Sequence, residues 1–129
     1  AYVIAHEIGH HVQSLTGAMQ KVRQAQQGAR TEAESNGYLV SLELQADCYA
    51  GVWAAHASAV SGGAVALEPG DMDEGLKTAQ AIGDDTLQRN AGRRVSPEAF
   101  THGSSEQRMK WLKHGYETGD PNACDTFGG

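Results

Sequence analysis

The sequence lacks several features that would place it in large classes of protein. No apolar run approaches the ~18–20 residues that a membrane-spanning helix needs. No basic patch is present, and the formal net charge of −6 disfavours nucleic-acid binding. Internal repeats and low-complexity tracts are absent as well. Hydrophobic residues make up 40% and charged residues 20% of the chain, which excludes wholesale disorder and predicts a globular fold.

Cysteine is scarce, since Cys48 and Cys124 are the only two and no C-x-x-C spacing occurs. The pair therefore cannot form a zinc knuckle. Two alternatives remain open, a disulfide and two free thiols. A disulfide would link the C-terminal tail covalently to the segment around Cys48 and would imply an oxidising compartment. By the chain-entropy model, such a long loop could contribute about 4 kcal/mol of stability.

Hydrophobic periodicity predicts a mainly α-helical chain. Apolar residues recur every three or four positions in four stretches, and no β-hairpin is apparent. The second, third and fourth stretches cover residues 32–59, 71–91 and 104–119. The first carries one apolar stripe, which consists of Ile4, Ile8, Val12, Leu15 and Met19. On a helical wheel, His6 and His10 lie away from this stripe.

Local signals place the helix ends. Gly17 or the region of Gly28 ends the first helix, and residues 61–64 break the second. Residues 83–85 split the third stretch, with an Asp as the N-cap of its second part. Ser104, with Gln107 three residues later, matches a capping box at the start of the last helix.

The chemistry of the chain centres on the H-E-x-x-H sequence at residues 6–10. Residues four apart lie on one face of a helix, so His6 and His10 can both direct a ring nitrogen at one metal ion. Glu7 lies between them and can reach a water on that ion, but not easily the ion itself. The alternative is a pair of surface histidines beside a solvated glutamate.

Glu43 and Asp47 supply the remaining parts of a metal site. They lie four residues apart at the edge of the buried face predicted for residues 32–59. Glu43 would be the third ligand and would leave a fourth position for water, as in catalytic rather than structural zinc sites. Asp47 could accept the other ring N–H of a ligating histidine. The alternative is that both carboxylates lie on a solvated helix face.

These residues predict metal-assisted hydrolysis with one Zn²⁺ per chain. Zinc held by two neutral histidines and a carboxylate activates water and polarises a peptide carbonyl. Glu7 would accept the proton of the water and deliver it to the leaving amine. His102, in a polar turn before the last helix, is the candidate donor to the oxyanion, and Arg108 is a second candidate. The alternative for His102 is an exposed loop histidine.

The chain opens directly into the metal-binding motif. Ala1 is followed by Tyr2-Val3-Ile4 without an initiator Met, a signal peptide or a helix cap. Because a catalytic helix normally follows elements that pack beneath it, we expect a fragment whose N-terminal part is missing. An export signal, a membrane anchor or a substrate-binding strand would belong to that part.

Four separate blocks of the sequence resemble the bacterial family of putative neutral zinc metallopeptidases. The blocks are residues 6–13, 43–53, 102–108 and 119–127. The resemblance spans nearly the whole chain but covers only the later portion of the family's domain. It implies that residues 1–129 form a single partial domain, the helical portion of a zincin-like metallopeptidase without its upstream β-containing half.

The resemblance also implies roles for individual residues in a gluzincin-type site. His6, His10 and Glu43 would be the zinc ligands, Glu7 the general base, and Asp47 the support of a ligand histidine. Family members typically carry an N-terminal membrane-spanning segment and a domain outside the cytoplasm. This implies a membrane-anchored protein at the cell surface or in the periplasm, which fits a Cys48–Cys124 bridge.

We interpret the chain as the catalytic portion of a zinc metallopeptidase, an endopeptidase that acts on peptide or protein substrates. The strand that would hold an extended substrate by β-addition is missing, so we expect a metal site here but not full activity. The rival interpretation is a non-catalytic, zinc-stabilised domain that binds a partner. An intact Glu7 argues against this rival, because a structural site needs no base. A third interpretation is a hydrolase of another amide.

Overall fold

The computed structural model describes residues 2–60 and 69–127, and these residues contain helices and no strand. The prediction of a mainly α fold is therefore confirmed. The α-helices are α1 (Tyr2–Thr16), α2 (Ala18–Gln27), α3 (Glu32–Val60), α4 (Pro69–Ala81), α5 (Asp84–Asn90) and α6 (Ser105–Thr118). Two short 3-10 helices follow α5 and α6, and these are η1 (Pro97–Ala99) and η2 (Pro121–Ala123).

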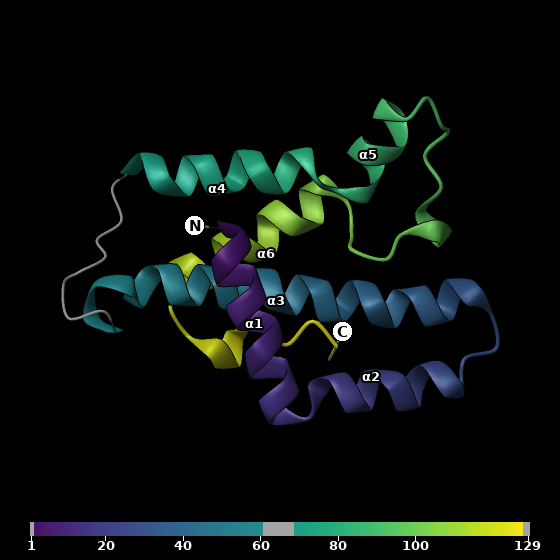
Figure 1. Ribbon diagram of the computed structural model, residues 1–129, viewed down its shortest axis with the longest axis horizontal. Coiled ribbons are helices and arrows are strands. Elements are labelled where there is room, and N and C mark those ends of the chain that lie inside the picture. The colour runs from purple at the N-terminus through teal and green to yellow at the C-terminus, as the bar shows by residue number, and fades with distance from the viewer. Residues whose placement is uncertain (1, 61–68, 128–129) are drawn as a thin grey trace.

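The long helix α3 is the centre of the arrangement (Figure 1). α1 crosses it, α2 runs back alongside it, and α6 packs on it between α3 and α4. This arrangement brings together three segments that are far apart in the sequence: the H-E-x-x-H helix, the middle of α3 and the beginning of α6.

Most of the predicted helix ends are found where the local signals placed them. Gly17 adopts a left-handed conformation with φ 85° and separates α1 from α2, and Gly28 caps α2. Ser104 and Gln107 form the predicted capping box at the start of α6, since each side chain accepts the backbone N–H of the other. The predicted break at residues 61–64 lies outside the described residues.

The prediction of an aspartate N-cap before α5 is wrong, because Gly83 occupies that position. A Cβ at residue 83 would lie 2.2 Å from the backbone nitrogen of Ser105, so only glycine fits between α5 and α6. Asp84 instead accepts three backbone N–H groups with Oδ2, from Thr101, His102 and Gly103. The carboxylate therefore fixes the loop that precedes α6.

The apolar stripe of α1 does not form the buried face that such a stripe usually indicates. Ile4 is 66% exposed, Ile8 38% and Leu15 74%. The buried residues of α1 are Ala5, His6, Gly9 and Gln13. α1 therefore packs on α3 through small and polar side chains, and the two histidines of the H-E-x-x-H sequence lie on the packed side of the helix.

Gly9 permits this close packing, and its replacement gives a first testable result. A Cβ at residue 9 would lie 2.8 Å from the carbonyl oxygen of Ala46 in α3, and a backbone atom cannot move aside as a side chain can. We expect Gly9→Ala to push α1 away from α3, to lower the free energy of unfolding by about 1–3 kcal/mol, and to weaken metal binding.

The matched control is Gly37→Ala, in the first half of α3. Apart from its chain neighbours and the backbone of its own helix, no atom lies within 4 Å of a Cβ at residue 37. We expect this variant to be unchanged, or stabilised by about 0.4–1 kcal/mol through the unfolded state. Denaturant unfolding and zinc titration of both variants measure the difference. Equal stability and equal zinc affinity in the two variants would contradict the close-packing account.

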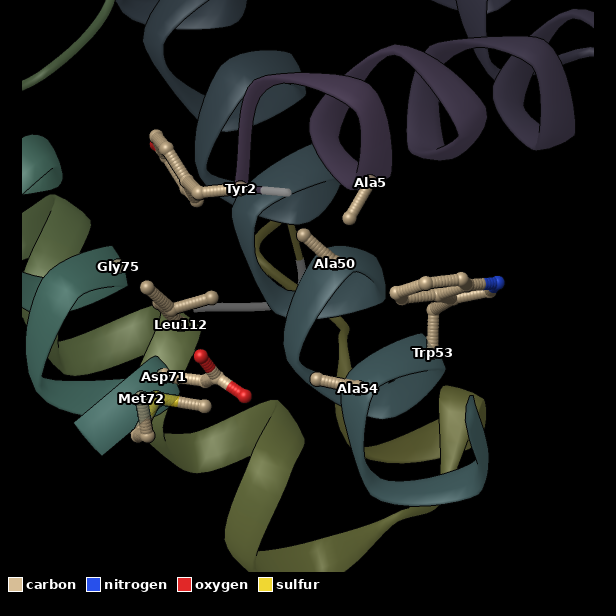
Figure 2. Close-up of a pocket in the computed structure, with 9 residues that line it drawn as sticks. All are labelled: Tyr2, Ala5, Ala50, Trp53, Ala54, Asp71, Met72, Gly75 and Leu112. Atoms are coloured by element: carbon tan, nitrogen blue, oxygen red, sulfur yellow. The ribbon is translucent and has the colours of Figure 1, made fainter. Parts of the chain in front are cut away.

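A small cavity lies in the core between α1, α3, α4 and α6 (Figure 2). Its volume is about 40 Å³, whereas ligand pockets usually exceed about 300 Å³. The buried core residues Ala5, Ala50 and Leu112 line it, and Trp53 and Met72 pack beside them. The space belongs to the packed core and has no room for a substrate.

Candidate metal centre

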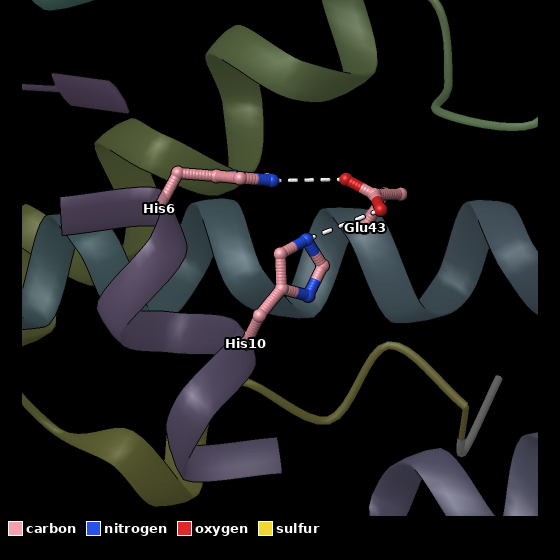
Figure 3. Close-up of side chains that lie close together, drawn as sticks. All are labelled: His6, His10 and Glu43. Atoms are coloured by element: carbon pink, nitrogen blue, oxygen red, sulfur yellow. Dashed lines mark hydrogen bonds and ion pairs between the residues drawn. The ribbon is translucent and has the colours of Figure 1, made fainter. Parts of the chain in front are cut away.

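Three predicted ligands meet at one point between α1 and α3 (Figure 3). His6 and His10 project from consecutive turns of α1 toward Glu43 on α3. The Nε2 atom of His6 lies 2.9 Å from Oε2 of Glu43, and the Nε2 atom of His10 lies 3.2 Å from Oε1. Among the described residues, this is the one cluster of His, Cys, Asp or Glu side chains that could hold a metal ion.

The donor set fits a divalent metal of the zinc type. Tetrahedral zinc with bonds of about 2.0–2.1 Å separates neighbouring ligand atoms by about 3.3 Å. The two measured contacts of 2.9 and 3.2 Å are close to this separation, so small side-chain movements would admit an ion. Two imidazoles and one carboxylate are also the ligands that a catalytic zinc site uses in peptidases.

The second ring nitrogen of each histidine is held by a hydrogen bond. Nδ1 of His6 donates to Oδ1 of Asp47 over 2.8 Å, and Nδ1 of His10 donates to Oε1 of Gln13 over 2.8 Å. An ionised carboxylate and an amide oxygen only accept, so both Nδ1 atoms carry the proton. The two Nε2 atoms are therefore the ones available to a metal, and both face Glu43.

Gln13 is a residue of the candidate site that the sequence analysis did not single out. It is fully buried, and its amide group donates to the carbonyl oxygen of Leu42 over 2.7 Å and to Oε1 of Gln45 over 2.9 Å. These contacts fix the amide that orients His10. The signal was present in the sequence, because a polar residue three positions after His10 shares its helix face.

The protonation of the cluster depends on the carboxylates. Burial lowers the pKa of His6, but hydrogen bonds to Asp47 and Glu43 outweigh it and raise the pKa to about 9. A hydrogen bond to Glu43 also raises the pKa of His10. Burial favours the protonated form of Glu43, yet hydrogen bonds from His10 and His6 hold its pKa well below the usual range. A bound metal would displace these protons.

The cluster lies in the wall of a cavity of about 340 Å³, which is within the range of ligand pockets. Glu7 and His102 line the same cavity. Glu7 is exposed and follows His6 on α1, so its carboxylate is accessible from the cavity. The remaining lining residues are Tyr2, Val3, Ile82, Leu87 and Arg108.

The two candidate oxyanion donors differ in their surroundings. The side chain of His102 is 51% exposed, and its Nδ1 atom lies 2.9 Å from Oγ1 of Thr101. Its backbone N–H donates to Asp84 over 2.7 Å, which holds His102 at the rim of the cavity. Arg108 is only 3% exposed, and its guanidinium is bound to Asp47. His102 therefore remains the candidate donor, whereas the guanidinium of Arg108, which lines the same cavity, is engaged by Asp47.

The other three histidines lie outside the cluster. His11 is exposed on α1. Nε2 of His56 contacts the carbonyl oxygen of Gly119 over 2.7 Å, and Nε2 of His114 contacts that of Ala123 over 3.1 Å. These two contacts join α3 and α6 to the C-terminal segment. Of the histidines, only His6 and His10 belong to the candidate cluster among the described residues.

A disulfide joins Cys48 in α3 to Cys124 after η2, with a Cα–Cα distance of 5.6 Å. Both cysteines are buried, and Cys48 directly follows Asp47. The sequence left open whether the two cysteines form a disulfide or remain free thiols, and the structure has the disulfide. A disulfide indicates an oxidising compartment. Within the described ranges, no helix has the length and hydrophobicity to cross a membrane.

The matching family model covers residues 1–127 and is described as "putative neutral zinc metallopeptidase". The chain therefore belongs to this family. An uncharacterised Escherichia coli protein, YpfJ, is 57% identical over 127 residues, which cover 98% of this chain and 42% of YpfJ. An uncharacterised Mycobacterium tuberculosis protein, Rv2575, is 52% identical over 132 residues, which cover 98% and 43%. The chain thus spans less than half the length of these relatives, and no solved structure matches it.

Proposed function

We propose that this protein is a zinc-dependent peptidase, in which His6, His10 and Glu43 hold the metal and Glu7 is the general base. One observation carries the proposal: two Nε2 atoms and a carboxylate converge at 2.9 and 3.2 Å in the wall of a cavity that Glu7 also lines. An accessible carboxylate between two ligands has a use in catalysis and none in a purely structural site.

The roles of the residues follow from their positions. When bound, zinc would supply the Lewis acidity that activates water and polarises the scissile carbonyl. Glu7 takes a proton from the attacking water and returns it to the nitrogen of the leaving amine, so one carboxylate serves both steps. Asp47 and Gln13 keep the two ligand rings in one tautomer throughout.

His102 is proposed as the group that stabilises the oxyanion during attack. It lines the same cavity as the cluster, and Asp84 fixes the loop that carries it. An imidazole N–H at the rim of the cavity would donate to the oxygen of the tetrahedral species. The proposed reaction thus uses groups from α1, from α3, which carries Glu43, and from the loop before α6.

The substrate and the location are part of the same proposal. We assign peptide or protein substrates, with cleavage inside the chain, because the cluster lies in the wall of a cavity of about 340 Å³ and zinc with these ligands would polarise a peptide carbonyl. The buried disulfide supports a location outside the cytoplasm, at the cell surface or in the periplasm. Anchoring to the membrane would come from a segment outside residues 1–129.

The test is hydrolysis of an unstructured protein and of quenched fluorescent peptides. We expect cleavage that a metal chelator abolishes and that added zinc restores. Mass spectrometry of the products separates cleavage within the chain from release of terminal residues. Zinc-loaded, folded protein that leaves every substrate intact would contradict the proposed peptidase activity.

A further inference from the structure

A buried ion pair lies directly behind the metal-binding cluster. Asp47 of α3 is 0% exposed and Arg108 of α6 is 3% exposed. Nε of Arg108 donates to Oδ2 of Asp47 over 2.9 Å, and Nη2 donates to Oδ1 over 3.2 Å. The guanidinium therefore holds both oxygens of the carboxylate, and this two-point contact fixes the plane of the carboxyl group.

Tyr2 of α1 completes this arrangement. Its hydroxyl donates to Oδ1 of Asp47 and accepts a hydrogen bond from Nη2 of Arg108 over 3.0 Å. The same Oδ1 accepts Nδ1–H of His6 over 2.8 Å. Three groups from two helices, α1 and α6, thus converge on one carboxylate oxygen of α3, and one of them is the ring of a proposed metal ligand.

A purely structural ion pair does not explain this geometry. Taking two charges out of water is costly, and apolar side chains of similar size would join α3 to α6 at least as well. Tyr2 and His6, which also contact Asp47, have no part in joining α3 to α6, since both belong to α1. All four hydrogen bonds to Asp47 hold its carboxylate in the orientation that faces Nδ1 of His6.

We infer that Arg108 and Tyr2 are positioning residues for the metal ligand His6. They act through Asp47, whose carboxylate they lock so that Nε2 of His6 points toward His10 and Glu43. This inference rests on the proposed metal site, in which His6 is a ligand. It gives Arg108 a role in orienting a metal ligand through Asp47.

The test measures metal affinity rather than peptidase activity. Zinc is titrated into metal-free protein in competition with a chromophoric chelator, for wild type, Tyr2→Phe and Arg108→Lys. We expect Tyr2→Phe to bind zinc about three- to tenfold more weakly, since it lacks one hydrogen bond to Asp47. Arg108→Lys keeps the charge but loses the two-point contact, and we expect a loss of about 10–100-fold.

A second readout separates positioning from general destabilisation. Cobalt(II) in the same site gives visible absorption bands that report ligand geometry, and we expect these bands to shift in both variants. Lys113→Met is the control, because it breaks the exposed Lys113–Glu117 pair on the same helix. It should leave zinc affinity and the cobalt spectrum unchanged.

Two results would overturn the inference, and only the second would also overturn the proposed peptidase function. If wild type binds zinc, and Tyr2→Phe and Arg108→Lys bind it equally well with the same cobalt spectrum, the ion pair is only structural and the proposed peptidase stands. If folded wild type binds neither metal, the inference and the proposed function fail together. Tyr2→Phe loses a single hydroxyl, so the test does not depend on the folding of Arg108 variants.

Discussion

Glu7→Gln is expected to lower the rate of peptide hydrolysis by about 10²–10⁴-fold while the protein still binds its metal. Glutamine has the shape of glutamate, but its amide does not accept the proton of the attacking water. Glu7 is not among the three side chains that converge on the metal position, so metal content should stay at the wild-type level. Rates with a quenched fluorescent peptide, together with zinc analysis of the same samples, measure both quantities.

The matched control is Glu74→Gln, the same substitution on the exposed surface of α4. We expect this variant to hydrolyse peptides at the wild-type rate. If Glu7→Gln retains full activity at full metal occupancy, another group accepts the proton, and the assignment of Glu7 is wrong. If instead it loses the metal, Glu7 contributes to binding and the ligand set needs revision.

Removal of the disulfide is expected to have the largest effect on stability. The bridge joins residues 76 positions apart, and the chain-entropy model gives about 4 kcal/mol for a loop of this length. Both sulfur-bearing residues are also buried, so their replacement leaves part of the core unfilled. We expect Cys48→Ala/Cys124→Ala to unfold at a much lower denaturant concentration than the oxidised wild type.

The control for this experiment is reduced wild type, which keeps both sulfur atoms and loses only the link. We expect reduction to cause most of the loss seen in the double variant. A change below about 1 kcal/mol in both cases would show that the bridge contributes little. The bridge also affects the site, because the carbonyl oxygen of Cys124 accepts from Gln45, which in turn contacts Gln13 behind His10.

Local spacing predicted the parts of the site that depend on one helix. The four-residue separation of His6 and His10 requires only that residues 2–16 be helical, and the structure has that helix. The capping box at Ser104 is equally local and was predictable for the same reason. The position of Glu43 beside the two histidines does not follow from spacing within one helix, because periodicity indicates that a segment is helical but not which helix packs against it.

Contacts between distant segments could not be predicted in this way. The exposed stripe of α1 shows the difficulty, since Leu15 has the pattern of a buried residue and is 74% exposed. The packed side is instead set by the close approach of Gly9 to Ala46, which no periodicity reveals. Arg108 was predicted only as a second candidate for the oxyanion donor, because the sequence does not show that α6 brings it to Asp47.

The measurement that tests the central claim most directly is the metal content of protein purified without added chelator. Wild type and Glu43→Ala are compared with Glu32→Ala, a control substitution in the exposed first turn of the same helix. We predict about one zinc per chain in wild type and Glu32→Ala, and much less in Glu43→Ala. Well-folded wild type without zinc, or equal zinc in all three proteins, would contradict this prediction.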